Sequence, residues 1–161
     1  MNVRLIDTSI MLNLLEVPNR CSDKDAVREE WRECLKNKDF LILPIATVIE
    51  TGNHIAHISN GNTRRQIAGK FADCLKKTAN NETPWRLYSQ KTDGNWLMYF
   101  AERLEESAVR EIGIGDLSII YDYERYKEET PAIGTIMIWS TDEHLKAYKE
   151  ENVNIRRRRK R

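Results

Sequence analysis

Four acidic residues occupy positions from which they can meet at one edge of a sheet. Asp7 and Asp142 each follow an apolar, strand-like run and each precede a helix-like stretch. If both runs are parallel strands of one sheet, both carboxylates reach its C-terminal edge. Glu50 lies in the segment just after a second apolar run, and Asp116 opens the helical segment that precedes the strand of Asp142. We therefore expect all four carboxylates at this edge.

Carboxylates gathered in this way repel one another. Two unit charges about 4 Å apart interact by roughly 4 kcal/mol at an effective dielectric near 20, and a whole domain is stable by only about 5–15 kcal/mol. Raised pKa values or a bound cation relieve the repulsion. Oxygen ligands without cysteine select Mg²⁺ or Mn²⁺. Such an ion activates water and neutralises charge on a phosphate, which predicts phosphoryl chemistry.

Each acid also has a purely structural interpretation. Asp7, Asp116 and Asp142 each stand where a helix N-cap is expected, since a carboxylate can accept a hydrogen bond from the first backbone N–H groups of a helix. Glu50 can be a surface acid. The functional interpretation therefore depends on the four acids being considered together.

Histidines offer a competing metal site. Glu50, His54 and His57 are spaced i, i+4 and i+7, which places them on one helix face with the spacing of metal ligands. A zinc or di-iron site needs further histidines, and the chain has only His144 besides these two. We therefore favour a substrate-facing or structural role for them.

The remaining pattern predicts strands that alternate with helices. Apolar runs predict strands at 3–9, 40–43, 132–139 and, at the edge, 153–155. Apolar periodicity and cap residues predict helices after residue 9, from Ser22–Asp23, over 46–58, from Thr63, over 95–111, from Asp116, and after Asp142. Residues 80–95 are polar and interrupted by Pro84 and Gly94, which predicts a loop. Alternation of this kind requires crossover connections and hence an α/β fold with a mainly parallel sheet.

Two details of these helices can be compared with a structure. In the helix at 22–35, Val27, Trp31 and Leu35 recur every four residues, and in the helix at 95–111 the residues expected to face inward are Leu97, Phe100, Ala101 and Leu104.

Bulk composition is that of one soluble domain. The chain has 161 residues, of which 32% are charged and 40% hydrophobic, and no apolar run approaches the roughly 20 residues of a membrane helix. Asp7 interrupts the N-terminus too early for a signal pattern. Cys21, Cys34 and Cys74 form no CxxC pair, which fits a reducing cytoplasm. There is no P-loop or nucleophile elbow, and Gly113-x-Gly115 lacks the third glycine of a dinucleotide fingerprint.

Charge is distributed unevenly along the chain. The net charge is +1, yet residues 156–161 are all basic, so residues 1–155 carry a net charge of −5. We expect a single domain over 1–155 followed by a basic tail at 156–161. A short basic run favours phosphate backbones, although a solvated tail explains it equally well.

Short motifs around the four acids resemble those of a known family. Asp7-Thr8-Ser9 at a strand end, Glu50 in a helix, Gly115-Asp116 at a helix start and Ser140-x-Asp142 at a strand end are similar to the acidic quartet of PIN domains. The order, the spacings and the length agree, over most of residues 1–150. The resemblance implies a three-layer PIN-like fold, a parallel sheet flanked by helices.

The resemblance also implies an activity, namely Mg²⁺- or Mn²⁺-dependent endoribonuclease cleavage of single-stranded or structured RNA. Asp7, Glu50, Asp116 and Asp142 would hold the metal and position the attacking water, with Ser9 and Ser140 supporting them. Many bacterial members resemble toxins of toxin–antitoxin pairs, which implies an antitoxin or other inhibitory protein as a partner. Whether the chain forms a homodimer stays open.

Basic and aromatic residues outside the acidic set could bind RNA, and two other functions are compatible with the sequence. Arg64 and Arg65, with Lys70 and Lys76, can bind substrate, or form a solvated helix face, and Trp85 can stack on bases. The first alternative is a catalytically silent RNA- or partner-binding module on the same fold. The second is a phosphatase-type hydrolase with Asp7 as nucleophile, which expects a second aspartate at the position of Ser9.

Overall fold

A five-stranded sheet forms the centre of the protein. The computed structural model describes residues 2–88, 90–130 and 134–151. The strands are β1 (Val3–Ile6), β2 (Phe40–Pro44), β3 (Trp85–Tyr88), β4 (Thr135–Trp139) and β5 (Lys149–Glu151). Their order is β3-β2-β1-β4-β5. The first four are parallel, and β5 is antiparallel to β4.

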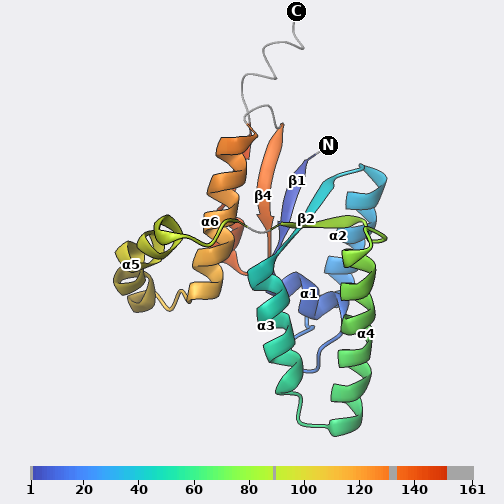
Figure 1. Cartoon of the computed structure of the whole chain (residues 1–161). Coiled ribbons are helices and arrows are strands. Elements are labelled where there is room, and N and C mark those ends of the chain that lie inside the picture. The colour runs from blue at the N-terminus through green and yellow to red at the C-terminus, as the bar shows by residue number, and fades with distance from the viewer. Residues whose placement is uncertain (1, 89, 131–133, 152–161) are drawn as a thin grey trace, which may run out of the picture.

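Helices cover both faces of this sheet (Figure 1). They are α1 (Thr8–Leu14), α2 (Lys24–Lys36), α3 (Ile45–Ala56), α4 (Gly61–Ala79), α5 (Gly94–Val109), α6 (Ile114–Glu129) and α7 (Glu143–Lys146). α1, α2 and α4 pack on one face in a core that includes Ile6, and α6 packs on the other in a core that includes Leu5. The predicted α/β fold, with a mainly parallel sheet flanked by helices, is confirmed.

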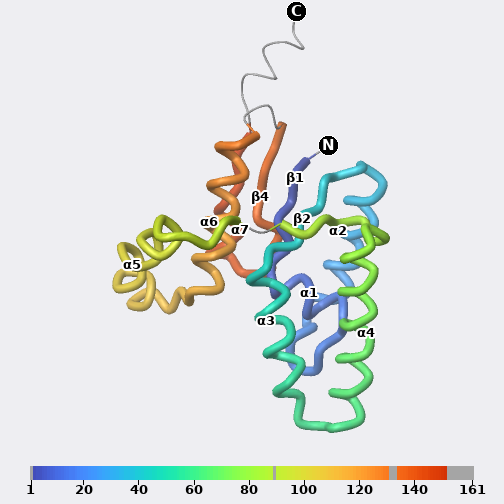
Figure 2. Tube along the Cα trace, in the orientation of Figure 1, coloured from blue at the N-terminus to red at the C-terminus, as the bar shows by residue number. Residues whose placement is uncertain are grey.

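The central strands are apolar on both sides because helices cover both sides. Leu5 and Ile6 point to opposite faces and both are fully buried, as are Leu41, Ile42 and Leu43 of β2. Continuous apolar runs of this kind are typical of strands in parallel sheets. In Figures 1 and 2, α1 and α3 leave from the same end of β1 and β2, so the chain segments that follow these strands lie together.

The expected loop at 80–95 is wrong, because it contains β3. Trp85 to Tyr88 pair in parallel with β2 and form an edge of the sheet. Trp85 is buried, lies 5.3 Å from Trp31 between ring centroids, and donates from its indole N–H to Thr78 at 2.9 Å. Trp85 is therefore a core residue and is not available to stack on bases. The sequence did not indicate a strand here, because β3 is short, follows Pro84 and has polar neighbours.

The inward face predicted for α5 is also wrong. Phe100 is buried as expected, but Leu97 is 62% exposed, Leu104 is 39% exposed and Ala101 is exposed too. Figure 2 shows the reason, since α5 stands away from the sheet beside the N-terminal half of α6. Its contact face is the aromatic one, where Tyr99 lies 4.8 Å from Tyr121 between ring centroids. Since α5 packs mainly against α6, only the side chains on that face are buried.

Several element boundaries differ from the prediction. Asn60, and not Thr63, caps α4, because the Asn60 side chain accepts a hydrogen bond from the Thr63 backbone N–H at 2.9 Å. In α2, Leu35 is 45% exposed and Cys34 is buried in its place. The edge strand beside β4 is β5, and the predicted strand at 153–155 and the basic tail lie outside the described residues. No helix in the described ranges is long and apolar enough to span a membrane.

Candidate functional site

The four predicted acids line one pocket. Asp7 follows β1, Glu50 lies in α3 one turn after β2, Asp116 lies in the first turn of α6, and Asp142 precedes α7 after β4. All four border a pocket of about 430 Å³ at the C-terminal edge of the sheet. The predicted convergence of the acids on this edge therefore holds.

Asp7 is the most firmly held of the four. It is 4% exposed, and its Oδ2 accepts hydrogen bonds from the Ser9 backbone N–H at 3.2 Å, the Ser9 hydroxyl at 2.7 Å and the Ser140 hydroxyl at 2.8 Å. The two hydroxyls in turn accept backbone N–H groups from Thr141 and Asp142, both at 2.9 Å. This network joins the ends of β1 and β4 and supports the roles predicted for Ser9 and Ser140.

Glu50 is positioned by contacts on both sides of α3. Thr47, one turn earlier, donates its hydroxyl to the carbonyl of Ile6 at 2.7 Å and so fixes α3 to the end of β1. The Thr8 hydroxyl then donates to Glu50 Oε2 at 2.9 Å. The Glu50 carboxylate lies against Gly115 of α6, where a Cβ atom would overlap Oε1 and would stand 2.8 Å from Oε2. Gly115 therefore allows Glu50 to approach the start of α6.

Asp116 is not the N-cap that its position suggested. Gly113 caps α6, and Asp116 lies within the first turn. Burial, followed by the nearby charges of Asp7, Glu50 and Asp142, raises the pKa of Asp116 from 3.8 to about 6. Asp116 is thus close enough to the other three carboxylates to be repelled by their charges.

Asp142 is the exposed member of the set and does cap its helix. Its Oδ1 accepts the backbone N–H of His144 at 2.8 Å. Asp7 likewise caps α1 through Ser9. Within the described residues, the second oxygens of Asp7 and Asp142 accept no hydrogen bond, and both residues border the pocket.

The chemistry of these donors fits a hard divalent cation, although the side chains do not form a closed ligand set. Across residues 2–88, 90–130 and 134–151, no three His, Cys, Asp or Glu side chains are grouped tightly enough to hold an ion as they stand. Glu50 and Asp7 are drawn toward hydroxyl groups instead. Carboxylates that repel one another are expected to remain apart until a cation draws them together.

The predicted arginines lie elsewhere. Arg64 and Arg65 do not border this pocket, and Arg64 donates to the carbonyl of Ile58 at 2.9 Å. His54 does border it, and its pKa is lowered by burial and by the charge of Arg20. The set of Glu50, His54 and His57 forms no metal cluster among the described residues.

Sequence reasoning missed several residues at the pocket, among them two charged residues and one buried asparagine. Asp23 and Arg20 come from the segment between α1 and α2, and Asn13 lies in α1. The buried Asn13 donates to the Ser9 carbonyl at 2.9 Å and accepts the Asp23 backbone N–H at 3.0 Å. Asn13 thereby holds this segment against the pocket. An asparagine among apolar residues, one turn after Ser9, was the available signal.

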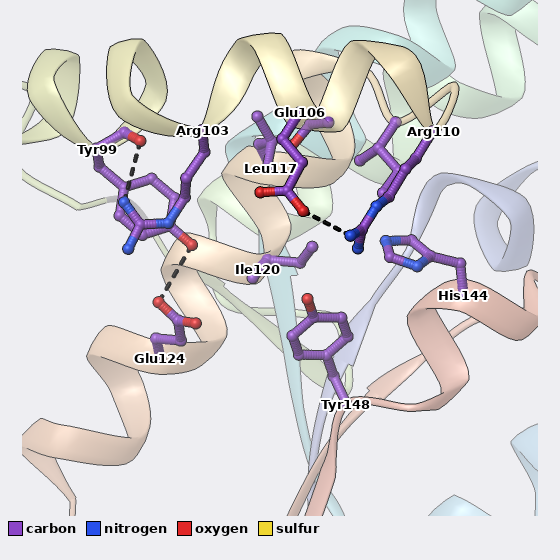
Figure 3. A pocket seen from close by; sticks show the side chains of 11 residues that line it. Tyr99, Arg103, Glu106, Arg110, Leu117, Ile120, Glu124, His144 and Tyr148 are labelled. Atoms are coloured by element: carbon purple, nitrogen blue, oxygen red, sulfur yellow. Dashed lines mark hydrogen bonds and ion pairs between the residues drawn. The ribbon is translucent and has the colours of Figure 1, made fainter.

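A second pocket, of about 180 Å³, lies between α5, α6 and α7 (Figure 3). Its charges pair with one another. Arg110 binds Glu106 at 2.5 Å, Arg103 lies 3.9 Å from the centroid of the Tyr99 ring, and the Tyr99 hydroxyl donates to Glu124 at 3.1 Å. None of the four acids borders this pocket, so we assign it no part in the candidate site.

Comparison with known proteins adds no relative. No protein-family model matches the sequence, and no curated protein matches it significantly. Function must be argued from the site itself.

Proposed function

We propose that this chain is a Mg²⁺- or Mn²⁺-dependent endoribonuclease of the PIN type. One observation carries the proposal: four acids from four distant parts of the sequence border a single pocket at the C-terminal edge of a parallel sheet. This is the arrangement that the resemblance to PIN domains implies. The raised pKa of Asp116 supports it, because structural acids rarely gather where they repel one another.

Each carboxylate has a distinct part in the proposed site. Asp7 is anchored through Oδ2, which leaves Oδ1 without a hydrogen bond among the described residues, and Glu50 is anchored through Oε2 by Thr8. Asp116 and Asp142 are the other two acids that border the pocket. A divalent cation bound by these carboxylates would activate a water molecule and neutralise charge on a phosphodiester. Ser9 and Ser140 hold Asp7 in place.

RNA is the proposed substrate because the resemblance to PIN domains implies it, and a bound divalent cation among the acids that border the pocket would attract a phosphodiester. Hydrolysis of this type leaves a 5′-phosphate and a free 3′-hydroxyl. A role as a toxin with an antitoxin partner rests on the resemblance alone. A cytoplasmic location is proposed from the three free cysteines.

The test is cleavage of a mixed single-stranded RNA pool with Mg²⁺, with Mn²⁺ and with chelator, by the wild type and by Asp116→Asn. Metal-dependent cutting that the variant loses is expected. Equal cutting by both proteins would assign the cleavage to a contaminant or to another site.

The alternative, a silent RNA- or partner-binding module, is favoured by one observation: the acids form no closed ligand set among the described residues. The two functions differ in cation binding. Calorimetric titration with Mn²⁺ should give a binding isotherm for a nuclease, whereas the silent module should give none and should still bind RNA.

A further inference from the structure

A groove continues from the acid pocket along the end of α3. Its volume is about 220 Å³, and it is bordered by Val17, Pro18, Asn19, Arg20, His54, His57, Ile58 and Ser59. Asn19, Arg20 and His54 border both the groove and the acid pocket. The two hollows are therefore adjacent parts of one surface depression.

The electrostatic character changes between these two parts. The acid pocket is bordered by five acids, whereas the groove is bordered by none, and its ionisable side chains are Arg20, His54 and His57. A phosphate in the acid pocket needs a cation to approach, but a phosphate in the groove meets the positively charged guanidinium of Arg20 directly, with the imidazoles of His54 and His57 beside it.

The guanidinium of Arg20 makes no hydrogen bond and no ion pair within the described residues. Of the arginines in the described ranges, only Arg20 and Arg65 make no side-chain hydrogen bond or ion pair, whereas others are engaged, such as Arg4 with Asp39. Arg65 borders neither hollow. Arg20 is thus the one unengaged arginine of the described chain that lies at the candidate site.

The backbone holds Arg20 at this place. The Arg20 N–H donates to the Val17 carbonyl at 3.0 Å, which closes a four-residue turn. Pro18 occupies the second position and Asn19 the third, with φ of 61°, the residues and conformation that a type II turn favours. A turn stiffened by proline limits the backbone entropy lost when Arg20 binds a ligand.

We propose that Arg20, with His54 and His57 beside it, forms a subsite for an RNA backbone phosphate next to the one that is cleaved. The inference rests on the proposed function and adds that the bound RNA leaves the acid pocket through the groove beside α3. A guanidinium can donate two parallel hydrogen bonds to a phosphate, which fixes the strand as well as attracting it. This subsite replaces the path predicted over Arg64 and Arg65.

Binding of a fluorescent single-stranded RNA, measured by anisotropy, tests the subsite. The full chain carries Asp116→Asn so that the RNA is not consumed, and it is compared with the same chain carrying Arg20→Gln, Arg20→Lys or Arg65→Gln. Arg20→Gln should weaken binding about tenfold and reduce the slope of log K against log salt by about 0.7. The affinity of Arg20→Lys for the RNA should lie between those of the parent chain and Arg20→Gln. The matched control Arg65→Gln should change the affinity less than twofold.

A phosphate-neutralisation scan locates the contact. In each RNA of the series, one phosphate is replaced by a neutral methylphosphonate. At one position the replacement should weaken binding to the chain that retains Arg20, and it should not weaken binding to the chain that carries Arg20→Gln. Equal behaviour of Arg20→Gln and Arg65→Gln, while the wild type still cuts the RNA pool, would overturn the subsite alone. A wild type that neither binds nor cuts RNA would overturn the subsite together with the proposed function.

Discussion

Replacing Asp116 by asparagine should stabilise the protein while removing the proposed nuclease activity. The pKa of Asp116 is raised from 3.8 to about 6, first by burial and then by the neighbouring acids. At neutral pH such a rise corresponds to a penalty of about 3 kcal/mol on the ionised form. Since the side chain is only partly buried, solvent screening reduces this to about 1–2 kcal/mol.

The pH dependence of this effect has a definite sign. The carboxyl has a higher pKa in the folded than in the unfolded chain, so wild-type stability falls as the pH rises from about 4 to about 6. Asparagine does not titrate. In chelator the variant should therefore match the wild type near pH 4 and exceed it by about 1–2 kcal/mol above pH 6.

Urea unfolding with and without cation measures both effects. Mg²⁺ at one hundred times its dissociation constant should stabilise the wild type by about 2.7 kcal/mol and the variant by much less. Asp73→Asn, on the exposed face of α4, is the matched control and should change neither quantity. A variant no more stable than the wild type at pH 7.5 in chelator would refute the repulsion argument, and a wild type indifferent to Mg²⁺ and Mn²⁺ would refute the metal site.

Three further substitutions separate positioning from charge. Gly115→Ala places a Cβ against the Glu50 carboxylate, so calorimetry should show about tenfold weaker Mn²⁺ binding with an unchanged melting temperature; unchanged affinity would argue against Glu50 as a ligand. Ser140→Ala removes a donor to Asp7 and should lower the free energy of unfolding in urea by about 1–2 kcal/mol; no loss would mean that the bond is replaced by water. Burial raises the pKa of Asp122 to about 7. Asp122→Asn should therefore stabilise the fold by at most about 4 kcal/mol above pH 7 and should have no effect below pH 4. Equal midpoints of urea unfolding for the two proteins at pH 8 would contradict this expectation.

The centre of the sheet and the position of the acids could be predicted because both follow from local pattern. β1 and β2 are continuous apolar runs, and a strand that ends in an acid and turns at once into a helix places that acid at the carboxyl edge. Asp7 and Asp142 then follow from the parallel pairing of β1 with β4, in which Ile6 lies opposite Trp139.

The predictions from sequence fail where contacts between distant parts of the chain determine the local structure. β3 is recognisable only through its pairing with β2, since its own sequence is short and follows Pro84. The contact face of α5 depends on its packing against α6, which apolar periodicity cannot reveal. Arg20 follows a proline turn with no periodic signal, so its place at the pocket depends on how Asn13 holds the segment.

Capping and catalysis, which are alternatives when only the sequence is known, are compatible in the structure. Asp7 caps α1 through Oδ2 and Asp142 caps α7 through Oδ1, so each acid that borders the pocket uses one oxygen for its helix and keeps a second oxygen that no hydrogen bond within the described residues occupies. The cap fixes the carboxylate, and a carboxylate that is already fixed loses less entropy when it binds a cation. Asparagine keeps the capping oxygen and removes the charge. Asn variants at these two positions should therefore fold like the wild type and fail only in cation binding, whereas plain structural caps would show no defect in Mn²⁺ titration.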